Sequence, residues 1–365
     1  MNALIAALLL MQAAPQPEEK KGFIDVVFCI DRSGSMQQVI DTAKEKVWGI
    51  VSEIAKSKPT PVLRIGLIGY GSADREFRFF GLTDDLDNVY KNLMTFRTDM
   101  GGDEWVGAVV KKAVDEMEWS KSKDALKIIF VVGNETAAQG REDVLYTKTV
   151  PEAIKKDIMV NAVYCGSPNA DEQRTWMEVA KLADGAYTKI DLSGGAITIP
   201  TPMDKDLVDL NAKLNGTYVP YGKHGAEGQK NQVEQDSNSN SNGGTSNGAQ
   251  RAQAKAWSGY NCRSWDLVDA SKEKDFKLED VKAEDLPKDM QSMTMDERRA
   301  HLAKKGAERD AVNKQINETG QKRQKFIDDE IKAKGLSQAN AFDEAVRATI
   351  RSQAAKRGYS FEEKK

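Results

Sequence analysis

The chain has 365 residues, of which 40% are hydrophobic and 30% are charged, and this length predicts one medium-sized folded domain with appended segments. Its 53 basic and 56 acidic residues give a formal net charge of −3, so no positive field favours nucleic acid or anionic lipid as a partner. The three cysteines lack C-x-x-C spacing, and both histidines, His224 and His301, stand in polar surroundings, which argues against a disulfide framework, a zinc site and histidine-based catalysis.

The N-terminal segment has the pattern of an export signal. An apolar run from Ala3 to Met11 precedes the small residues Ala13 and Ala14, and this run is shorter than the roughly 20 residues that a membrane span needs. We therefore predict a signal peptide and spacer over residues 1–20, no membrane span in the mature chain, and a secreted or periplasmic location. The alternative is a disordered start, because no lysine or arginine precedes the apolar run.

Residues 22–200 alternate short apolar runs with amphipathic segments. The expected strands are 23–30, 62–70, 76–82, 126–133, 158–166 and 186–190. The expected helices are 37–56, 85–95, 105–118, 150–157 and 171–183. Nearly continuous apolar runs are typical of strands that are buried on both faces of a parallel sheet. Helices between such strands indicate a doubly wound α/β fold with a mostly parallel sheet.

The second half of the chain differs in composition. We expect residues 201–227 to be a connecting segment. Residues 228–250 are rich in Asn, Ser, Gln and Gly, a composition that predicts a flexible linker and a domain boundary. Residues 251–365 are highly charged and show helical spacing, so we predict an α-helical C-terminal tail.

One long helix is predicted within this tail. Thr294 and Glu297 form a T-x-x-E capping box at its start, and Gly335 is placed to end it after Lys334. Its apolar residues are sparse and only loosely heptad-spaced. Two interpretations stay open: a coiled-coil surface for a partner, or a solvated helix packed against the last helical segment, at about residues 340–356.

The stretch DRSGS follows the first predicted strand and suits a metal ion. Asp31, Ser33 and Ser35 supply one carboxylate and two hydroxyls from a single tight turn. Such hard oxygen ligands favour Mg²⁺, Ca²⁺ or Mn²⁺ over soft metals, and doubly wound sheets bind ligands beyond the carboxyl ends of their strands. The alternative is that these residues only cap the helix that follows.

Two further turns at the same predicted edge can complete the ligand set. Asp103 and Glu104 precede the helix expected at 105–118, and Asn134 follows the strand expected at 126–133. Each has a simpler explanation. The acidic pair can interact favourably with the dipole of the next helix, and Asn134 can be an ordinary polar loop residue.

Together, the motifs DRSGS, GGDE and IIFVVGNE resemble a von Willebrand factor A domain over about residues 22–200. The stretches GNETAAQG and WDLVDA are similar to secreted bacterial proteins that contain this domain. The resemblance implies a metal-ion-dependent adhesion site (MIDAS). Its divalent cation, Mg²⁺ first and Ca²⁺ or Mn²⁺ second, keeps an open position for a carboxylate from a partner protein. The DRSGS motif matches the first metal loop of this family without departure.

The other two loops depart from the family pattern. The second loop usually supplies a threonine, and here Glu104, with Asp103 as second choice, stands in its place. The third loop usually supplies an aspartate, and here Asn134 stands in its place. The resemblance therefore implies that a negative charge in the second loop compensates for the neutral amide in the third.

This resemblance implies that the site recognises a partner protein and does not convert a substrate. We therefore expect an exported binding module that is not an enzyme. One alternative is a hydrolase whose cation activates water, although the sequence has no G-x-S-x-G or P-loop motif. Another alternative is a scaffold that acts through its C-terminal helices. The sequence identifies neither the partner nor the oligomeric state.

Overall fold

The computed structural model describes residues 22–72, 76–99, 101–190, 198–335 and 342–361. The predicted signal peptide lies outside these residues. We call residues 22–190 the sheet domain and residues 198–361 the C-terminal region. The strands of the central sheet are β1 (Phe23–Asp31), β3 (Val62–Tyr70), β4 (Arg78–Thr83), β5 (Leu126–Gly133), β6 (Met159–Tyr164) and β7 (Tyr187–Lys189).

The sheet has the strand order β4-β3-β1-β5-β6-β7. Neighbouring strands are parallel except for β4, which pairs with β3 in antiparallel fashion at one edge. The chain runs from β1 outward to β3 and β4, then returns to β5 on the other side of β1. This reversal makes the carboxyl end of β1 the switch point where ligands of doubly wound sheets bind. The predicted mostly parallel α/β fold is confirmed.

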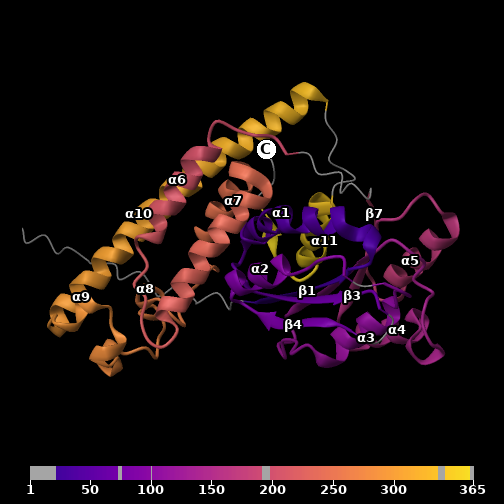
Figure 1. Cartoon of the computed structure of the whole chain (residues 1–365), viewed down its shortest axis with the longest axis horizontal. Coiled ribbons are helices and arrows are strands. Elements are labelled where there is room, and N and C mark those ends of the chain that lie inside the picture. Colours follow the sequence, from indigo (N-terminus) through magenta and orange to yellow (C-terminus); the bar gives the residue numbers. More distant parts are fainter. Residues whose placement is uncertain (1–21, 73–75, 100, 191–197, 336–341, 362–365) are drawn as a thin grey trace, which may run out of the picture.

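Helices cover both faces of this sheet (Figure 1). One face carries α1 (Gln37–Ile54) and α2 (Leu86–Met94), and the other carries α3 (Val106–Glu116), α4 (Tyr146–Lys155) and α5 (Ala170–Leu182). Since successive side chains of a strand point to opposite faces, β1 contributes alternate residues to two separate hydrophobic cores. Because both faces are covered, its side chains are buried on both sides.

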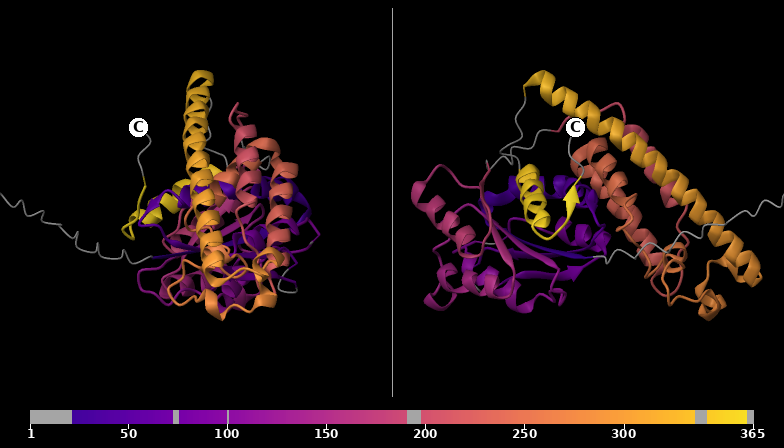
Figure 2. Two further views of the ribbon diagram at one scale, coloured as in Figure 1. Left: turned by 90° about the vertical axis from the view of Figure 1, so that its left-hand side faces the viewer. Right: turned by 180° about the vertical axis from the view of Figure 1, so that it is seen from behind.

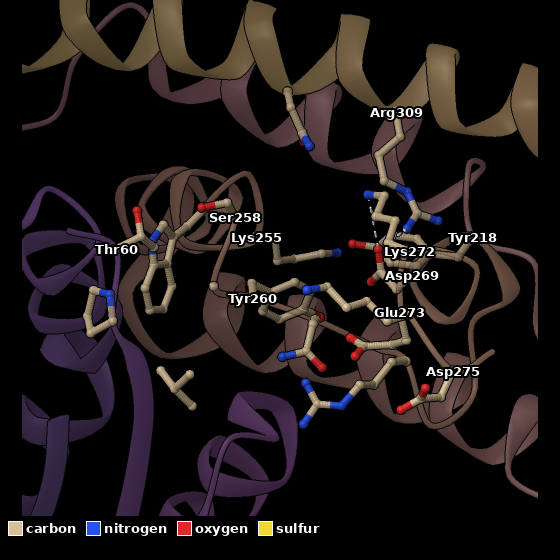
Figure 3. Close-up of a pocket in the computed structure, with 18 residues that line it drawn as sticks. Thr60, Tyr218, Lys255, Ser258, Tyr260, Asp269, Lys272, Glu273, Asp275 and Arg309 are labelled. Atoms are coloured by element: carbon tan, nitrogen blue, oxygen red, sulfur yellow. Dashed lines mark hydrogen bonds and ion pairs between the residues drawn. The ribbon is translucent and has the colours of Figure 1, made fainter. Parts of the chain in front are cut away.

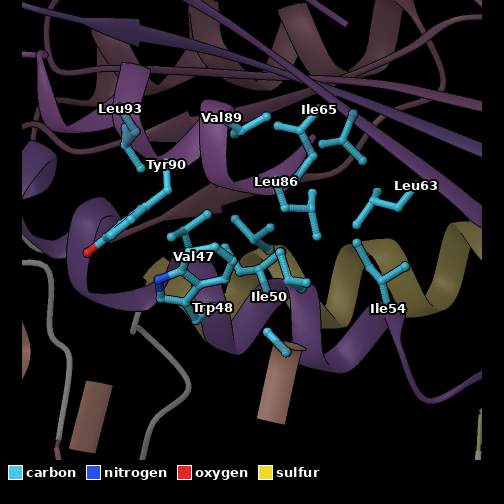
Figure 4. Packing of buried hydrophobic residues seen from close by; sticks show 14 of the residues in the cluster. Val47, Trp48, Ile50, Ile54, Leu63, Ile65, Leu86, Val89, Tyr90 and Leu93 are labelled. Atoms are coloured by element: carbon cyan, nitrogen blue, oxygen red, sulfur yellow. The ribbon is translucent and has the colours of Figure 1, made fainter. Parts of the chain in front are cut away.

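The core under α1 and α2 is packed from apolar and aromatic side chains (Figure 4). Trp48 from α1 and Tyr90 from α2 are buried, and their ring centroids lie 4.9 Å apart. Ile50 and Ile54 continue the same face of α1, one helical turn apart, toward Leu63 at the start of β3. The spacing of these residues along α1 is the helical period that predicted this helix.

The C-terminal region is helical. Its helices are α6 (Asp204–Asn215), α7 (Gly225–Lys255), α8 (Leu267–Ala270), α9 (Lys288–Gln291), α10 (Met295–Lys334) and α11 (Phe342–Ala355). A short strand, β8 (Ser360–Phe361), pairs in antiparallel fashion with β2 (Ser57–Lys58). Single 3₁₀ turns stand at η1 (Gly34–Met36), η2 (Glu142–Val144), η3 (Leu278–Asp280) and η4 (Ala283–Asp285). None of the helices that the structure describes has both the length and the apolar character to cross a bilayer.

The prediction of a flexible linker over residues 228–250 is wrong, because this segment forms most of α7. The helix turns back on itself at Gly243 and Gly244, where the backbone leaves helical geometry and Gly244 adopts a φ of 63°. The two arms then run antiparallel: the amide of Asn247 donates to the backbone carbonyl of Ser239 at 3.0 Å. The prediction of a plain connecting segment over 201–227 is also wrong, since α6 lies within it.

No domain boundary separates the two regions. Helices α7 and α11 both pack against α1, and residues of the C-terminal region such as Ala252, Ile316 and Phe342 belong to the same hydrophobic core as Ile50. Figure 2 shows α10 as a long straight helix that runs alongside α6 and α7. Its predicted capping box and its glycine end at Gly335 are confirmed. Of the two interpretations left open for this helix, packing against the last helical segment is not what the structure shows, because α10 packs mainly on α6, α7 and α8.

Buried ion pairs join the two regions. Arg251 of α7, which is fully buried, contacts Asp87 of α2 at 2.6 Å and Asp236 at 2.9 Å, and its guanidinium lies 4.4 Å from the centre of the Trp48 ring. Asp236 also accepts from Lys255 at 3.0 Å. Such a cluster fixes the orientation of α7 relative to α2, because each buried charge needs its partner of opposite charge nearby.

Candidate metal site

Three loops converge at the carboxyl edge of the sheet, and they carry the predicted metal ligands. The first follows β1, the second precedes α3, and the third follows β5. Since β1 and β5 are adjacent parallel strands, their ends bring the first and third loops together. The loop before α3 then reaches the same edge.

The first loop folds around the carboxylate of Asp31. The backbone N–H of Ser33 donates to one carboxylate oxygen at 2.7 Å, and the Ser33 hydroxyl donates to the other at 3.0 Å. The hydroxyls of Ser33 and Ser35 lie 3.3 Å apart. Neither the 3₁₀ turn that starts after Ser33 nor α1, whose N-cap is Met36, receives a side-chain capping bond. Helix capping therefore does not account for this motif.

A glycine from the next strand makes room for the same carboxylate. Gly71 follows β3 with a φ of 131°, and a Cβ atom at this position would lie 2.9 Å from Asp31 Oδ1. The backbone N–H of Arg32 donates to the carbonyl of Tyr70 at 2.8 Å. Only glycine combines this conformation with such a close approach. The glycine directly after an apolar strand, in GYGS, is a sequence signal that could have indicated this contact.

The second loop contributes Glu104 and not Asp103. Glu104 is buried, with 3% of its surface exposed, and its side chain hydrogen-bonds to those of Asp31 and Ser33. Asp103 is exposed, and its carboxylate accepts from the indole N–H of Trp105 at 3.3 Å. The structure thus brings the first-choice residue of this loop to Asp31 and leaves the second choice outside the cluster.

Asn134 joins the cluster from the third loop. Its amide Nδ2 donates to the hydroxyl of Ser35 at 2.8 Å. Its carbonyl oxygen Oδ1 is buried and has no hydrogen-bond partner among the described residues. A buried acceptor without a partner costs about 1–3 kcal/mol, so this oxygen is placed to accept from a group that the protein itself does not supply.

Two carboxyls in contact dominate the electrostatics of the site. Burial, then the hydrogen bond to Asp31 and its charge, raise the pKa of Glu104 to about 9. Burial likewise raises the pKa of Asp31, while hydrogen bonds from Glu104 and Ser33 act in the opposite direction. The nearby charge of Glu135 raises the pKa of both groups. Two such carboxyls are stable together only with a proton or a cation between them.

Gln139 and Glu135 of the third loop hold the second loop in place through hydrogen bonds. Of these two residues, Gln139 could not have been identified from the sequence. The side-chain oxygen of Gln139 accepts from the backbone N–H of Glu104, and its Nε2 donates to Glu135 at 2.6 Å. This bridge holds Glu104 against Asp31. Nothing in the sequence distinguishes Gln139 from any other polar loop residue, whereas Glu135 follows Asn134 directly in the GNET stretch.

The residues present fit a hard divalent cation. No cluster of three or more Cys, His, Asp and Glu that could hold a metal occurs in the part of the chain that the structure describes, so a cation here depends on hydroxyl and amide oxygens as well. The donor set is all oxygen, which Mg²⁺, Ca²⁺ and Mn²⁺ prefer. It consists of Asp31, Ser33, Ser35, Glu104 and Asn134. A dication would balance the paired carboxyls and give the unpartnered Asn134 oxygen a partner.

Comparison with known proteins identifies a similarity to one family. Residues 25–190 match the family model described as von Willebrand factor type A domain. No curated protein sequence matches the chain.

Three of the solved structures to which the chain is similar are described below. The conserved hypothetical protein BatB from Bacteroides thetaiotaomicron is 16% identical, with a TM-score of 0.37 over 46% of this chain and 90% of BatB. Proximal thread matrix protein 1 from the mussel byssus, solved with a zinc-occupied MIDAS motif, is 14% identical, with a TM-score of 0.38 over 47% of this chain and 42% of that chain. The pilus adhesin SpaC from Lactobacillus rhamnosus GG is 15% identical, with a TM-score of 0.36 over 47% of this chain and 28% of SpaC.

Proposed function

Because residues 25–190 match the family model described as von Willebrand factor type A domain, we propose that the chain is a binding module that engages an acidic group of a protein partner through a divalent cation. Asp31, Ser33, Ser35, Glu104 and Asn134 would hold the cation. When bound, the cation supplies a positive centre with a free position for a carboxylate oxygen. The family often mediates metal-dependent protein interactions, which supports this proposal.

One observation carries the proposal: two buried carboxyls, Asp31 and Glu104, meet at the switch point of the sheet beside the unpartnered oxygen of Asn134. A protein gains nothing in stability from burying two like charges in contact. The arrangement is instead typical of a site that binds a positive ligand. Mg²⁺ is the cation that we propose first, because its preferred ligands are carboxylate, hydroxyl and water oxygens.

We propose that the site binds its partner without catalysing a reaction. The side-chain hydrogen bonds described for the cluster link carboxyl, hydroxyl and amide groups to one another. A hydrolase would need, besides these ligands, a base positioned to take a proton from water. Assays of the purified chain with phosphoester and peptide substrates, in Mg²⁺ or Mn²⁺, address this point, and turnover that Asp31→Ala abolishes would favour the hydrolase.

An exported location is part of the same proposal. It is supported by the apolar run Ala3–Met11 and the small residues after it, which have the composition of a signal peptide. Mass spectrometry of the N-terminus of the protein, recovered from the medium or periplasm of its host, tests this. An intact Met1 on cytoplasmic protein would contradict it.

Calorimetric titration of the full chain with Mg²⁺, Ca²⁺ and Mn²⁺ tests the metal site. We expect binding in the wild type, loss of binding in Asp31→Ala and Glu104→Gln, and unchanged binding in Asp103→Asn. The last variant is a matched control, because it removes a carboxylate from the same loop but outside the cluster. If none of the three cations releases or takes up heat, the proposal fails.

Capture of partners from host extract then tests recognition. We expect a partner that is retained in Mg²⁺ and lost both in EDTA and with the Asp31→Ala variant. Deleting the C-terminal helices is not a clean test of the alternative scaffold function, because α7 and α11 cover α1. A partner that binds Asp31→Ala as well as the wild type would instead support the scaffold.

A further inference from the structure

The loops around the metal site carry an excess of negative charge. Five loops lie at the carboxyl edge of the sheet: residues 32–36, 71–77, 95–105, 134–145 and 165–169. The acidic residues among the described part of these loops are Glu76, Asp99, Asp103, Glu104, Glu135, Glu142 and Asp143, and the basic residues are Arg32, Arg97 and Arg141. Since the whole chain has a formal net charge of only −3, this edge is more acidic than the chain as a whole.

Two of the three basic residues are bound to other carboxylates of the same loops. Arg32 forms an ion pair with Asp99 and donates to the backbone carbonyl of Arg97 at 3.1 Å, so Arg97 lies beside that pair. Arg141 donates to Asp143 at 3.2 Å. The positive charges at this edge are therefore largely taken up by Asp99 and Asp143.

Glu135 and Asp103 are exposed carboxylates that each adjoin a proposed metal ligand along the chain. The partners that the described part of the chain supplies to them are neutral groups. Glu135 accepts from the amide of Gln139 at 2.6 Å, and Asp103 accepts from the indole N–H of Trp105 at 3.3 Å. Because neutral donors leave the net charge unchanged, both side chains present a negative charge to an approaching partner.

A bound dication does not reverse this balance. Its two positive charges are matched by the carboxylates of Asp31 and Glu104, so the filled site as a whole is neutral. The cation still offers a coordination position to a partner's carboxylate, but that carboxylate would approach Glu135 and Asp103. Like charges that face each other across an interface disfavour binding, so a partner binds best if it brings a positive charge of its own.

The largest cavity that the structure describes has the opposite arrangement of charges (Figure 3). It has a volume of about 980 Å³ and is lined by Thr60 at the amino edge of the sheet, where the parallel strands begin, and by Arg309 on α10. Its buried cations are paired within the protein. Arg309 donates to Asp266 at 2.7 Å, and Lys255 donates to Asp236 at 3.0 Å. Since these buried charges are already matched, the unmatched charge at the metal loops is the stronger guide to a partner.

We propose that the partner carries a lysine or arginine next to the carboxylate that it gives to the cation, and that this basic side chain pairs with Glu135 and Asp103. The inference rests on the proposed function, because it describes the neighbourhood of the carboxylate that the cation binds. A basic residue within about three positions of the acid, about 10 Å along an extended chain, satisfies it. Charges at the periphery of an interface chiefly determine which partner is selected and how fast it binds.

A random peptide library displayed on phage tests this inference, with the full-length protein as the immobilised target. Phage are bound in Mg²⁺ and eluted with EDTA, so the recovered peptides are those held through the metal. We expect these peptides to combine Asp or Glu with a nearby Lys or Arg. The same selection on Asp103→Lys should still recover acidic peptides but lose the preference for basic neighbours. Glu135→Gln should also reduce that preference, and it keeps the test open if circular dichroism shows that Asp103→Lys is not folded.

Calorimetric titration with one recovered peptide measures the size of the effect. Replacing its basic residue by alanine should weaken binding to the wild type about threefold, the effect of one exposed ion pair. The same replacement should not weaken binding to Asp103→Lys. Asp209→Asn is the matched control, because it removes an exposed carboxylate from α6 in the C-terminal region, and it should leave both the selection and the affinity as in the wild type.

The outcomes distinguish this inference from the proposed function. If EDTA elutes no acidic peptide, the proposed function fails and this inference fails with it. If EDTA elutes acidic peptides that show no preference for Lys or Arg, only this inference is overturned. The same holds if the preference for Lys or Arg is as strong on the folded variants Asp103→Lys and Glu135→Gln as on the wild type.

Discussion

The sheet domain and the C-terminal region differ in their buried ion pairs: among the described residues, the ion pairs whose two side chains are both at most 10% exposed all involve the C-terminal region. The inner strands of the sheet bury apolar side chains on both faces, as the neighbouring residues Phe130 and Val131 of β5 illustrate. The C-terminal region buries charges: Arg251, Lys255 and Arg309 are each at least 97% covered, with carboxylates against them. Apolar packing tolerates many sequences, whereas a buried ion pair requires a particular partner at a particular place.

This difference determines how much stability a single mutation should remove in each region. An apolar contact contributes in proportion to the area that it buries. A buried ion pair adds little net stability, but losing one partner leaves an uncompensated charge and costs about 3–5 kcal/mol. The C-terminal region should therefore be more sensitive to single charge deletions than to single losses of apolar volume.

The largest effect is expected from Arg251→Ala. Removing the guanidinium leaves Asp87 and Asp236 buried without this partner, so the free energy of unfolding should fall by about 4 kcal/mol. Urea unfolding followed by circular dichroism measures it. Lys205→Ala is the control, because its pair with Asp209 is exposed and should leave the free energy of unfolding nearly unchanged. If Arg251→Ala lowers the free energy of unfolding no more than Lys205→Ala does, the ion cluster is not what joins the two regions.

A somewhat smaller effect is expected in the sheet. Ile129 is fully buried in β5, and Ile129→Ala should lower the free energy of unfolding by about 3 kcal/mol through the cavity that it leaves. Ile129→Val should cost only about 1 kcal/mol. Both losses should be the same at pH 7 and at pH 3, because no charge is involved. A pH-dependent loss would contradict the contrast between the two regions.

An acid-dependent effect is expected at Asp236 of the C-terminal region. Burial alone would raise the pKa of Asp236, but Lys255 and Arg251 lower it to about 2, below the ordinary value of about 3.9. Its stabilising contribution is therefore present above about pH 4 and is lost as the pH falls toward 2, by about 2 kcal/mol in total. Unfolding free energies across this range should show the loss in the wild type.

Asp236→Asn provides the comparison for this pH dependence. The variant should be less stable than the wild type at pH 6, and its stability should fall less steeply between pH 4 and pH 2. Equal slopes for the two proteins would mean that other carboxyls control acid unfolding.

The smallest effect is expected at the start of α10. The hydroxyl of Thr294 accepts from the backbone N–H of Glu297 and donates to its carboxylate. Thr294→Ala removes this cap and should cost about 1 kcal/mol, whereas Thr294→Ser keeps the hydroxyl and should cost little. Hydrogen exchange over the first turn of α10 measures the local effect. Equal exchange in both variants would mean that tertiary contacts alone hold this helix end.

The sequence predicted the sheet domain closely because apolar periodicity decides its structure. The strands expected at 62–70 and 126–133 coincide with β3 and β5. The helix expected at 150–157 begins at Tyr146 instead, so that Pro151 lies inside it. Proline is most favourable in the first helical turn, and here tertiary packing of Tyr146 and Val150 in the core overrides that preference.

The helical hairpin of α7 could not be predicted from apolar periodicity. Its two arms approach through small and polar side chains: a Cβ atom on Gly248 would lie 2.9 Å from Val208 of α6 and in contact with Asn240. Ser239 is buried and accepts from the indole N–H of Trp48 at 2.9 Å. A composition of Asn, Ser and Gly is typical of flexible linkers, and only the tertiary partners distinguish the two cases.

For the metal loops, residue types and strand ends were sufficient to predict which side chains meet. Asp31, Ser33 and Ser35 lie in one turn, so local sequence determines their proximity. Placing Glu104 rather than Asp103 beside them depends on the direction in which the loop before α3 turns. That direction is fixed by the contact with Gln139, which lies 35 residues further along the chain and leaves no local signal.

The pairing of β8 with β2 has a mechanical consequence. It brings Ser360 beside Lys58 at the amino edge of the sheet, and Tyr359 contacts Gly22 at the start of β1. If a force pulled Gly22 and Phe361 apart, the first contacts to resist it would be the β2–β8 strand pair and the packing of α11 on α1. The nine-residue β1, about 30 Å long, would separate that load from the metal loops. Anchoring the protein through this edge would leave the opposite rim facing outward and undistorted.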